Sequence, residues 1–68
     1  MVPSLSTTAA AGLIAGARSL RGEAIRARTA ALRTEDPEAR AALERAARGM
    51  DSYAFLLAVL AELCGPGQ

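Results

Sequence analysis

Few side chains in this chain could perform acid–base, nucleophilic or metal chemistry. The chain has no histidine and a single cysteine, Cys64, so His and Cys cannot build a zinc site and no internal disulfide can form. Cys64 has no histidine to activate it as a nucleophile, and Glu62 is the only charged residue in the apolar run 53–63. We therefore predict a non-enzymatic protein that holds no metal and no cofactor.

A serine that follows an aspartate ahead of this apolar run is the one signal for a covalent attachment. The stretch GMDSYAFLLAVLAEL, residues 49–63, resembles the segment of acyl carrier proteins in which an Asp-Ser pair precedes a helix. The resemblance implies that Ser52 carries a phosphopantetheine arm and that Asp51 helps to position the transferase. A carrier modified at Ser52 is a minor alternative here, because residues 36–50 have a strong helical pattern where that family has a long loop.

The elements that position these residues are expected to be helices. Alanine supplies 17 residues, all eight basic residues are arginine, and β-branched and aromatic residues are few. This composition favours helix over sheet and indicates a GC-rich bacterial gene. The start of the chain lacks a basic segment ahead of its apolar stretch, and no apolar run reaches the ~20 residues of a spanning helix. We therefore expect a cytoplasmic protein.

The clearest break in the chain is RTEDPEAR, residues 33–40. Asp36 suits the N-cap, Pro37 the first helical position and Glu38 the first turn of a second helix. CGPG at 64–67 predicts the end of that helix, with Gly65 as its cap. A short connection makes the two helices antiparallel neighbours. The predicted fold is an all-α antiparallel helical hairpin with helices at about 7–34 and 37–64, in a single domain at 6–64 between a disordered start at 1–5 and a tail at 65–68.

Both predicted helices carry a coiled-coil repeat, in which apolar positions alternate at spacings of three and four residues. The second repeat runs through Gly49 without a phase shift, which favours one continuous helix over a break there with Asp51 as a new N-cap. In this register Ser52 faces solvent, and we expect the small first seam to pack against the large second seam. The first seam is Ala10, Leu13, Ala17, Leu20, Ala24, Ala27 and Ala31; the second is Ala39, Leu43, Ala46, Met50, Tyr53, Leu57, Leu60 and Cys64.

The terminal end of this hairpin is apolar around most of both helices, at residues 9–17 and 53–63. Pairing within one chain buries only the seam, so we expect self-association into a homodimer or larger four-helix bundle. The alternatives are a purely structural bundle and an adaptor, regulator or accessory subunit that docks on another protein. Ile25 and Leu32, nearer the connection, are also expected to stay exposed. The predicted interface residues are Leu13, Ile14, Leu20, Met50, Tyr53, Phe55, Leu56, Leu57, Val59, Leu60 and Leu63.

Every arginine lies between residues 18 and 48, where the first helix is basic and the second is net acidic. Charge pairing between the helices explains this pattern. A weaker alternative is contact of Arg18, Arg21 and Arg28 with an anionic partner such as a nucleotide or nucleic acid. A net charge of +1 and few aromatics disfavour nucleic acid, and the absence of basic residues beside the apolar end disfavours a membrane. A small-molecule cavity lined by Tyr53 and Met50 is a further alternative.

Overall fold

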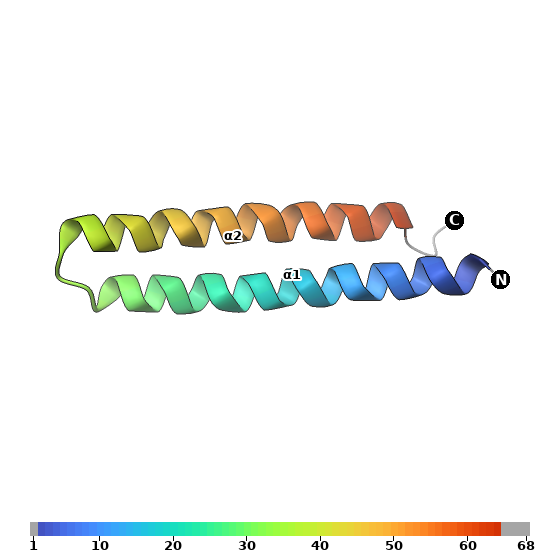
Figure 1. Cartoon of the computed structure of the whole chain (residues 1–68), viewed down its shortest axis with the longest axis horizontal. Helices are drawn as coiled ribbons and strands as arrows, with labels where there is room; N and C mark the ends of the chain where they lie inside the picture. Colours follow the sequence, from blue (N-terminus) through green and yellow to red (C-terminus); the bar gives the residue numbers. More distant parts are fainter. Residues whose placement is uncertain (1, 65–68) are drawn as a thin grey trace.

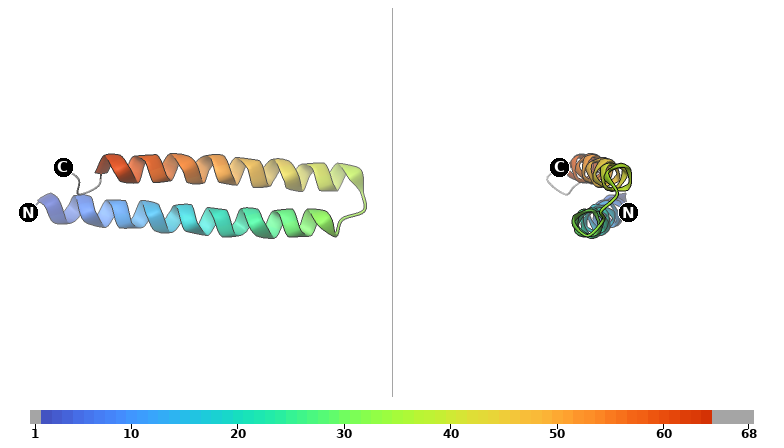
Figure 2. Two further views of the ribbon diagram at one scale, coloured as in Figure 1. Left: turned by 180° about the vertical axis from the view of Figure 1, so that it is seen from behind. Right: turned by 90° about the vertical axis from the view of Figure 1, so that its left-hand side faces the viewer.

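The computed structural model describes residues 2–64, with side chains from Thr8 onward. It contains two helices, α1 (Val2–Leu32) and α2 (Pro37–Cys64), joined by residues 33–36, and no strand within these bounds. The helices run antiparallel, so the start of α1 and the end of α2 lie at the same end of a rod of 54 × 13 × 12 Å (Figure 1). Figure 2 shows the pair from behind and end-on, again side by side. The predicted helical hairpin is confirmed.

The first helix begins earlier than the sequence indicates, at Val2 instead of near residue 7, and ends at Leu32 instead of near residue 34. Pro3 does not prevent the early start, because it falls in the first turn, where a missing backbone N–H removes no helical hydrogen bond. The expected disorder of residues 1–5 in solution stays a prediction. The cap at Gly65 and the tail at 65–68 lie outside the described residues.

Hydrogen bonds from both sides hold the connection between the helices. Asp36 Oδ2 accepts a hydrogen bond from the backbone N–H of Ala39 at 3.0 Å, which is the predicted N-cap. The Thr34 hydroxyl donates to the carbonyl of Ala30 at 2.7 Å. The Arg40 guanidinium donates to the Thr34 carbonyl from Nε at 3.1 Å and from Nη2 at 2.9 Å. A side chain of α2 thus binds the backbone just after the end of α1.

The second helix is continuous through Gly49, Asp51 and Ser52. The alternative of a break at Gly49 with Asp51 as a new N-cap is wrong. The apolar residues of α2 keep the same spacing on both sides of Gly49, and the helix continues through it. Ser52 therefore occupies an exposed position in the middle of a helix, as expected from the repeat.

Alanine alone forms the buried core of the hairpin. In α1 the predicted repeat is confirmed, because its alanines are buried at intervals of seven residues while Leu13 and Leu20 are half-buried beside them. In α2 another set of alanines with the same interval faces them. The buried residues are Ala10, Ala17, Ala24 and Ala31 of α1 and Ala47, Ala54 and Ala61 of α2, none more than 6% exposed.

The seam predicted for the second helix is half wrong. Its members Leu43, Met50, Leu57 and Cys64 are half-buried, but Ala39, Ala46, Tyr53 and Leu60 are exposed, and Ala47, Ala54 and Ala61 take their place. The expected packing of small against large is therefore replaced by small against small. Alanine facing alanine lets the two backbones approach more closely than alanine facing leucine or tyrosine. As a result α2 is turned so that its large side chains flank the seam.

Candidate interaction surface

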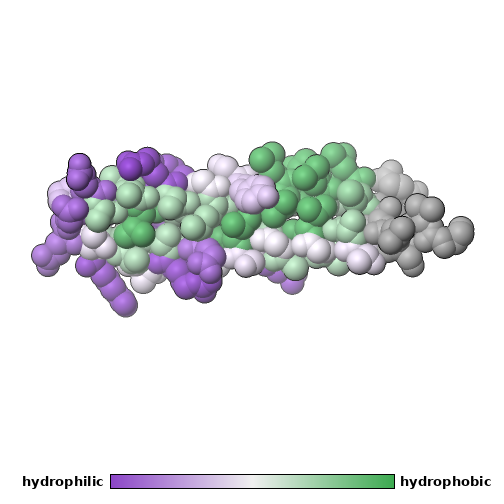
Figure 3. Space-filling view, in the orientation of Figure 1, coloured by the Kyte–Doolittle hydropathy of each residue, from purple (hydrophilic) through white to green (hydrophobic). Residues whose placement is uncertain are grey.

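The hairpin leaves most of its large apolar side chains in contact with solvent. Every buried residue in the described part of the chain is an alanine. The hydrophobic side chains gather over the half of α2 that is nearest the chain ends (Figure 3). The exposure expected for Ile14, Ile25, Leu32, Phe55, Leu56, Val59 and Leu63 is confirmed, whereas Tyr53 and Leu60, expected on the seam, join them. These nine side chains are 37–87% exposed.

Two contacts between the helices define two long faces of the rod. On one side Leu57 of α2 lies over Gly16 of α1. On the other side the Arg28 guanidinium donates a hydrogen bond of 2.6 Å to the Asp51 carboxylate. Residues three or four positions away along a helix lie on the same side of it. We call the side of Gly16 and Leu57 the apolar face and the side of Arg28 and Asp51 the charged face.

On α2 the apolar face is bordered by a ridge of large side chains at spacings of three, four and three residues. The ridge stands beside Met50 and Leu57, which are half-buried against α1. Six of the predicted interface residues thus come together on one side of α2. We call the four outer side chains, which are 47–71% exposed, the α2 ridge: Tyr53, Leu56, Leu60 and Leu63.

On α1 the apolar face is lined by small residues. Gly12, Gly16 and Ser19 follow one another at spacings of four and three, beside the half-buried Leu13 and Leu20. A β-carbon on Gly16 would lie 3.3 Å from Cδ1 of Leu57, whereas a β-carbon on Gly12 would meet nothing within 4 Å. Contact inside the hairpin therefore explains why residue 16 is the small Gly16. No contact inside the hairpin explains why a glycine is also present at Gly12. We call Gly12, Gly16 and Ser19 the small-residue flank.

Glu23 and Arg26 continue the spacing of the small-residue flank, four and then three residues beyond Ser19, and are the charged residues that helical spacing places on the apolar face within the described part of the chain. The Glu23 carboxylate accepts a hydrogen bond from Nη2 of Arg26. This hydrogen bond and the charge of Arg26 hold the pKa of Glu23 below its ordinary value. The apolar face thus carries a single carboxylate, which is already paired at the edge of the face.

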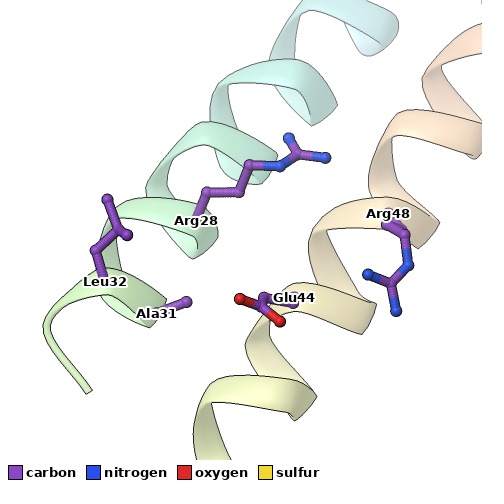
Figure 4. Close-up of a pocket in the computed structure, with 5 residues that line it drawn as sticks. All are labelled: Arg28, Ala31, Leu32, Glu44 and Arg48. Atoms are coloured by element: carbon purple, nitrogen blue, oxygen red, sulfur yellow. The ribbon is translucent and has the colours of Figure 1, made fainter. Parts of the chain in front are cut away.

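The charged face combines arginines of α1 with acidic residues of α2. Arg28 and Asp51 are 47% and 43% exposed, so their ion pair contributes little to stability. Towards the connection lies an open pocket of about 490 Å³, in which Glu44 points between the helices and Leu32 points away from α2 (Figure 4). The pocket is lined by Arg28, Ala31, Leu32, Glu44 and Arg48. Its lining combines one carboxylate with two guanidiniums, so the positive charge of the arginines is partly offset.

The three arginines predicted as anion contacts share the charged face of α1. Arg28 is bound to Asp51, whereas Arg18 and Arg21 are exposed and form no ion pair with a described residue. Three apolar residues lie on the same stripe, at alternating spacings of four and three residues, and Ile25 separates Arg21 from Arg28. The full stripe reads Ile14, Arg18, Arg21, Ile25, Arg28 and Leu32.

The residues that could do chemistry are not brought together. Ser52 and Glu62 are exposed but lie about 15 Å apart along α2, and Cys64 is a half-buried free thiol at its end. From residue 2 to residue 64, no three acidic or cysteine side chains are grouped so that they could hold a metal ion. Neither helix, over the residues described, has the length and apolar character needed to cross a membrane.

Sequence reasoning missed the alanine column of α2 and the small-residue flank of α1. The signal for the column was present, because alanine recurs at Ala47, Ala54 and Ala61 with the seven-residue interval of the first helix. No comparable signal marks Gly12, since its importance depends on which side of α1 the second helix occupies.

The chain matches no protein-family model, and no curated protein or solved structure is significantly similar to it.

Proposed function

We propose that this chain is a non-enzymatic interaction protein that works as a self-associated helical hairpin, with two copies forming a four-helix bundle. The observation that carries the proposal is the contrast between a core made of alanine alone and six large apolar side chains exposed along one half of α2. Contiguous apolar surface of this kind is typical of a protein–protein contact.

The free energy of folding also favours association. Burying a leucine, valine or phenylalanine side chain contributes about 1.5–3 kcal/mol, several times the contribution of an alanine methyl group. A domain of about 60 residues buries only about 60% of its unfolded surface and is marginally stable on its own. Packing against a second hairpin would move Leu56, Leu60 and their neighbours from water into a shared core.

The distribution of apolar residues around α2 suits a four-helix bundle. A helix in such a bundle contacts two neighbours and needs a wide apolar stripe, three positions in every seven residues. On α2 the first column is the buried alanines, the second contains Met50 and Leu57, and the third contains Tyr53 and Leu60. The hairpin uses the first two columns. The third column is available to a second copy.

Thermal unfolding across about a hundredfold range of concentration tests this proposal, because the Tm of a dimer that unfolds to monomers rises with concentration. Leu60→Glu should lower the Tm and abolish its concentration dependence by placing a charge in the shared core. Ile25→Glu is the matched control, since Ile25 is also exposed but lies on the charged face. A wild-type Tm that does not change with concentration would overturn self-association.

Phe55 supports an additional role as an adaptor for a different protein. It is 64% exposed and lies one turn beyond Asp51, on the side of α2 away from the apolar face. A bundle formed through the apolar face leaves this aromatic side chain on its outer surface, where such residues often anchor a partner. Phe55→Ala should preserve the mass of the dimer but lose a protein that co-purifies with the wild type. Identical co-purified proteins would contradict the adaptor role.

A further inference from the structure

We infer that the second copy docks in one defined way: its α2 ridge lies on the small-residue flank of α1, and the two-fold axis runs parallel to the helices. The inference rests on the proposed self-association. It adds the face, the orientation and the residues in contact.

Heights along the rod determine which residues meet. Because Leu57 lies over Gly16, residues of the antiparallel helices whose numbers sum to about 73 lie at the same height. Leu56 and Leu60 are therefore level with residues 17 and 13 of α1. Rotation about an axis parallel to the helices leaves heights unchanged, so Leu56 and Leu60 of a second copy arrive beside the small-residue flank.

Ridge and flank are complementary in size. The ridge presents four large side chains, and the flank presents two glycines and a serine. Gly12 costs α1 about 1 kcal/mol of helix propensity relative to alanine. Within the hairpin the space next to Gly12 is empty, since a β-carbon there would meet nothing within 4 Å. A leucine from a second copy is the occupant that makes use of this space.

The uneven distribution of apolar side chains along the rod selects the orientation. Hydrophobic side chains cover the terminal half of α2, and the half next to the connection mixes hydrophilic side chains with small apolar ones (Figure 3). A two-fold axis perpendicular to the helices through the middle of the rod would place the apolar half of one copy on the more polar half of the other, and such an axis through the apolar half would leave the rest of each rod uncovered. An axis parallel to the helices places the apolar half of one copy on the apolar half of the other. It also brings both connections to the same end.

The area and charge of the apolar face suit a second copy. One long side of the rod is about a quarter of the total surface of 4974 Å², so contact along its whole length would exceed the ~800 Å² per partner of a standard interface. Among the described residues the charges on this face are Glu23 and Arg26, which form an ion pair with each other. Tyr53 of the second copy comes level with residue 20, within a turn of Glu23, and its hydroxyl can donate to that carboxylate.

Gly12→Leu and Gly22→Leu form a matched pair for the test. Both replace a glycine of α1 by the same strong helix former, but Gly22 faces away from the apolar face, where a β-carbon would lie 3.9 Å from Arg26. In sedimentation equilibrium, Gly12→Leu should raise the dimer Kd at least tenfold. Gly22→Leu should leave the Kd unchanged or lower it, and unchanged helicity by circular dichroism shows that each variant is folded.

The outcomes separate this inference from the proposed function. A Gly12→Leu protein that dimerises as tightly as the wild type overturns the contact, while self-association stands. A monomeric wild type overturns the proposed function itself and makes a different protein the occupant of the apolar face.

Spin labels on the connection test the orientation separately. Glu35→Cys in a Cys64→Ala background puts one label near the turn of each copy. A parallel axis predicts a distance between the labels well below half of the 54 Å length of the rod. A distance close to that full length would overturn the parallel orientation.

Discussion

Leu57 of α2 packs on Gly16 of α1, with its Cδ1 atom 3.3 Å from the position that a β-carbon of residue 16 would take. On the opposite side of the same alanine seam, Arg28 pairs with Asp51. The two sides of the seam are therefore different in chemistry: one is closed by hydrocarbon and the other by an exposed ion pair. This difference gives the rod one apolar and one charged face.

The contact of Leu57 with Gly16 predicts how alanine is tolerated in α1. Gly22→Ala should raise the free energy of unfolding by about 0.5–1 kcal/mol, because alanine is the better helix former and has room there. Gly16→Ala should stabilise clearly less, because Leu57 must move by a few tenths of an ångström. Urea unfolding at one fixed protein concentration compares the two. Equal stabilisation by both substitutions would show that Leu57 does not lie over Gly16.

The alanine seam predicts that a larger side chain in its middle is destabilising. Ala54 is fully buried, so Ala54→Leu should force the helices apart and lower the free energy of unfolding by about 1–3 kcal/mol. Ala15→Leu, at an exposed position of α1, should change it by less than about 0.5 kcal/mol. Urea unfolding measures both. Stabilisation by Ala54→Leu would mean that the large residues of α2, and not its alanines, face α1.

Removal of the N-cap at the start of α2 should lower the free energy of unfolding. Asp36→Ala removes the acceptor of the Ala39 N–H and should cost about 1 kcal/mol, whereas Asp36→Ser keeps an acceptor and should cost much less. Glu35→Ala is the control, because the Glu35 side chain takes no part in the cap. Chemical unfolding measures the free energy of unfolding of the three variants. Equal losses of this free energy for Asp36→Ala and Asp36→Ser would refute the capping role.

The ion pair at the edge of the apolar face predicts a pKa change. Arg26 holds the pKa of Glu23 below its ordinary value of 4.5, mainly through their hydrogen bond. A lowered pKa in the folded state means that the contribution to stability is present above the unfolded-state pKa and is lost as pH falls through the folded-state pKa. Arg26→Ala should raise the pKa of Glu23 in an NMR titration, and Arg33→Ala should not. Because the pair is exposed, the accompanying change in stability should be small.

The boundaries and continuity of the helices could be predicted because they depend on local chemistry. Asp36 and Pro37 mark the start of α2 through hydrogen bonding and backbone geometry that involve only neighbouring residues. The unbroken spacing through Gly49 likewise indicated a continuous helix. The early start of α1 was missed because the hydroxyl residues at 6–8 suit the cap of a helix that begins near residue 7, whereas the helix continues back through Pro3, which is tolerated in a first turn.

The rotation of α2 could not be predicted from spacing, because two columns of the helix have the same repeat. Tyr53 and Leu60 recur with the same interval as Ala54 and Ala61, and the larger residues looked like the better core. The alanine column faces α1, because two facing alanine columns let the helices approach closely. This close approach depends on both helices and cannot be read from the spacing in one of them. The exposure of Phe55 and Leu63 was predictable, since no single partner helix can cover an apolar surface all round. The small-residue flank was not, since it is defined by the side that α2 occupies.

Self-association requires that a second copy cover the apolar face. The most direct measurement is the absolute mass of the wild-type chain by light scattering on a sizing column, over about a hundredfold range of concentration. A chain of 7.0 kDa should give twice that mass over most of the range, falling toward one copy only on strong dilution. A mass of 7.0 kDa at every concentration would contradict self-association, because the α2 ridge would then be uncovered in a stable monomer.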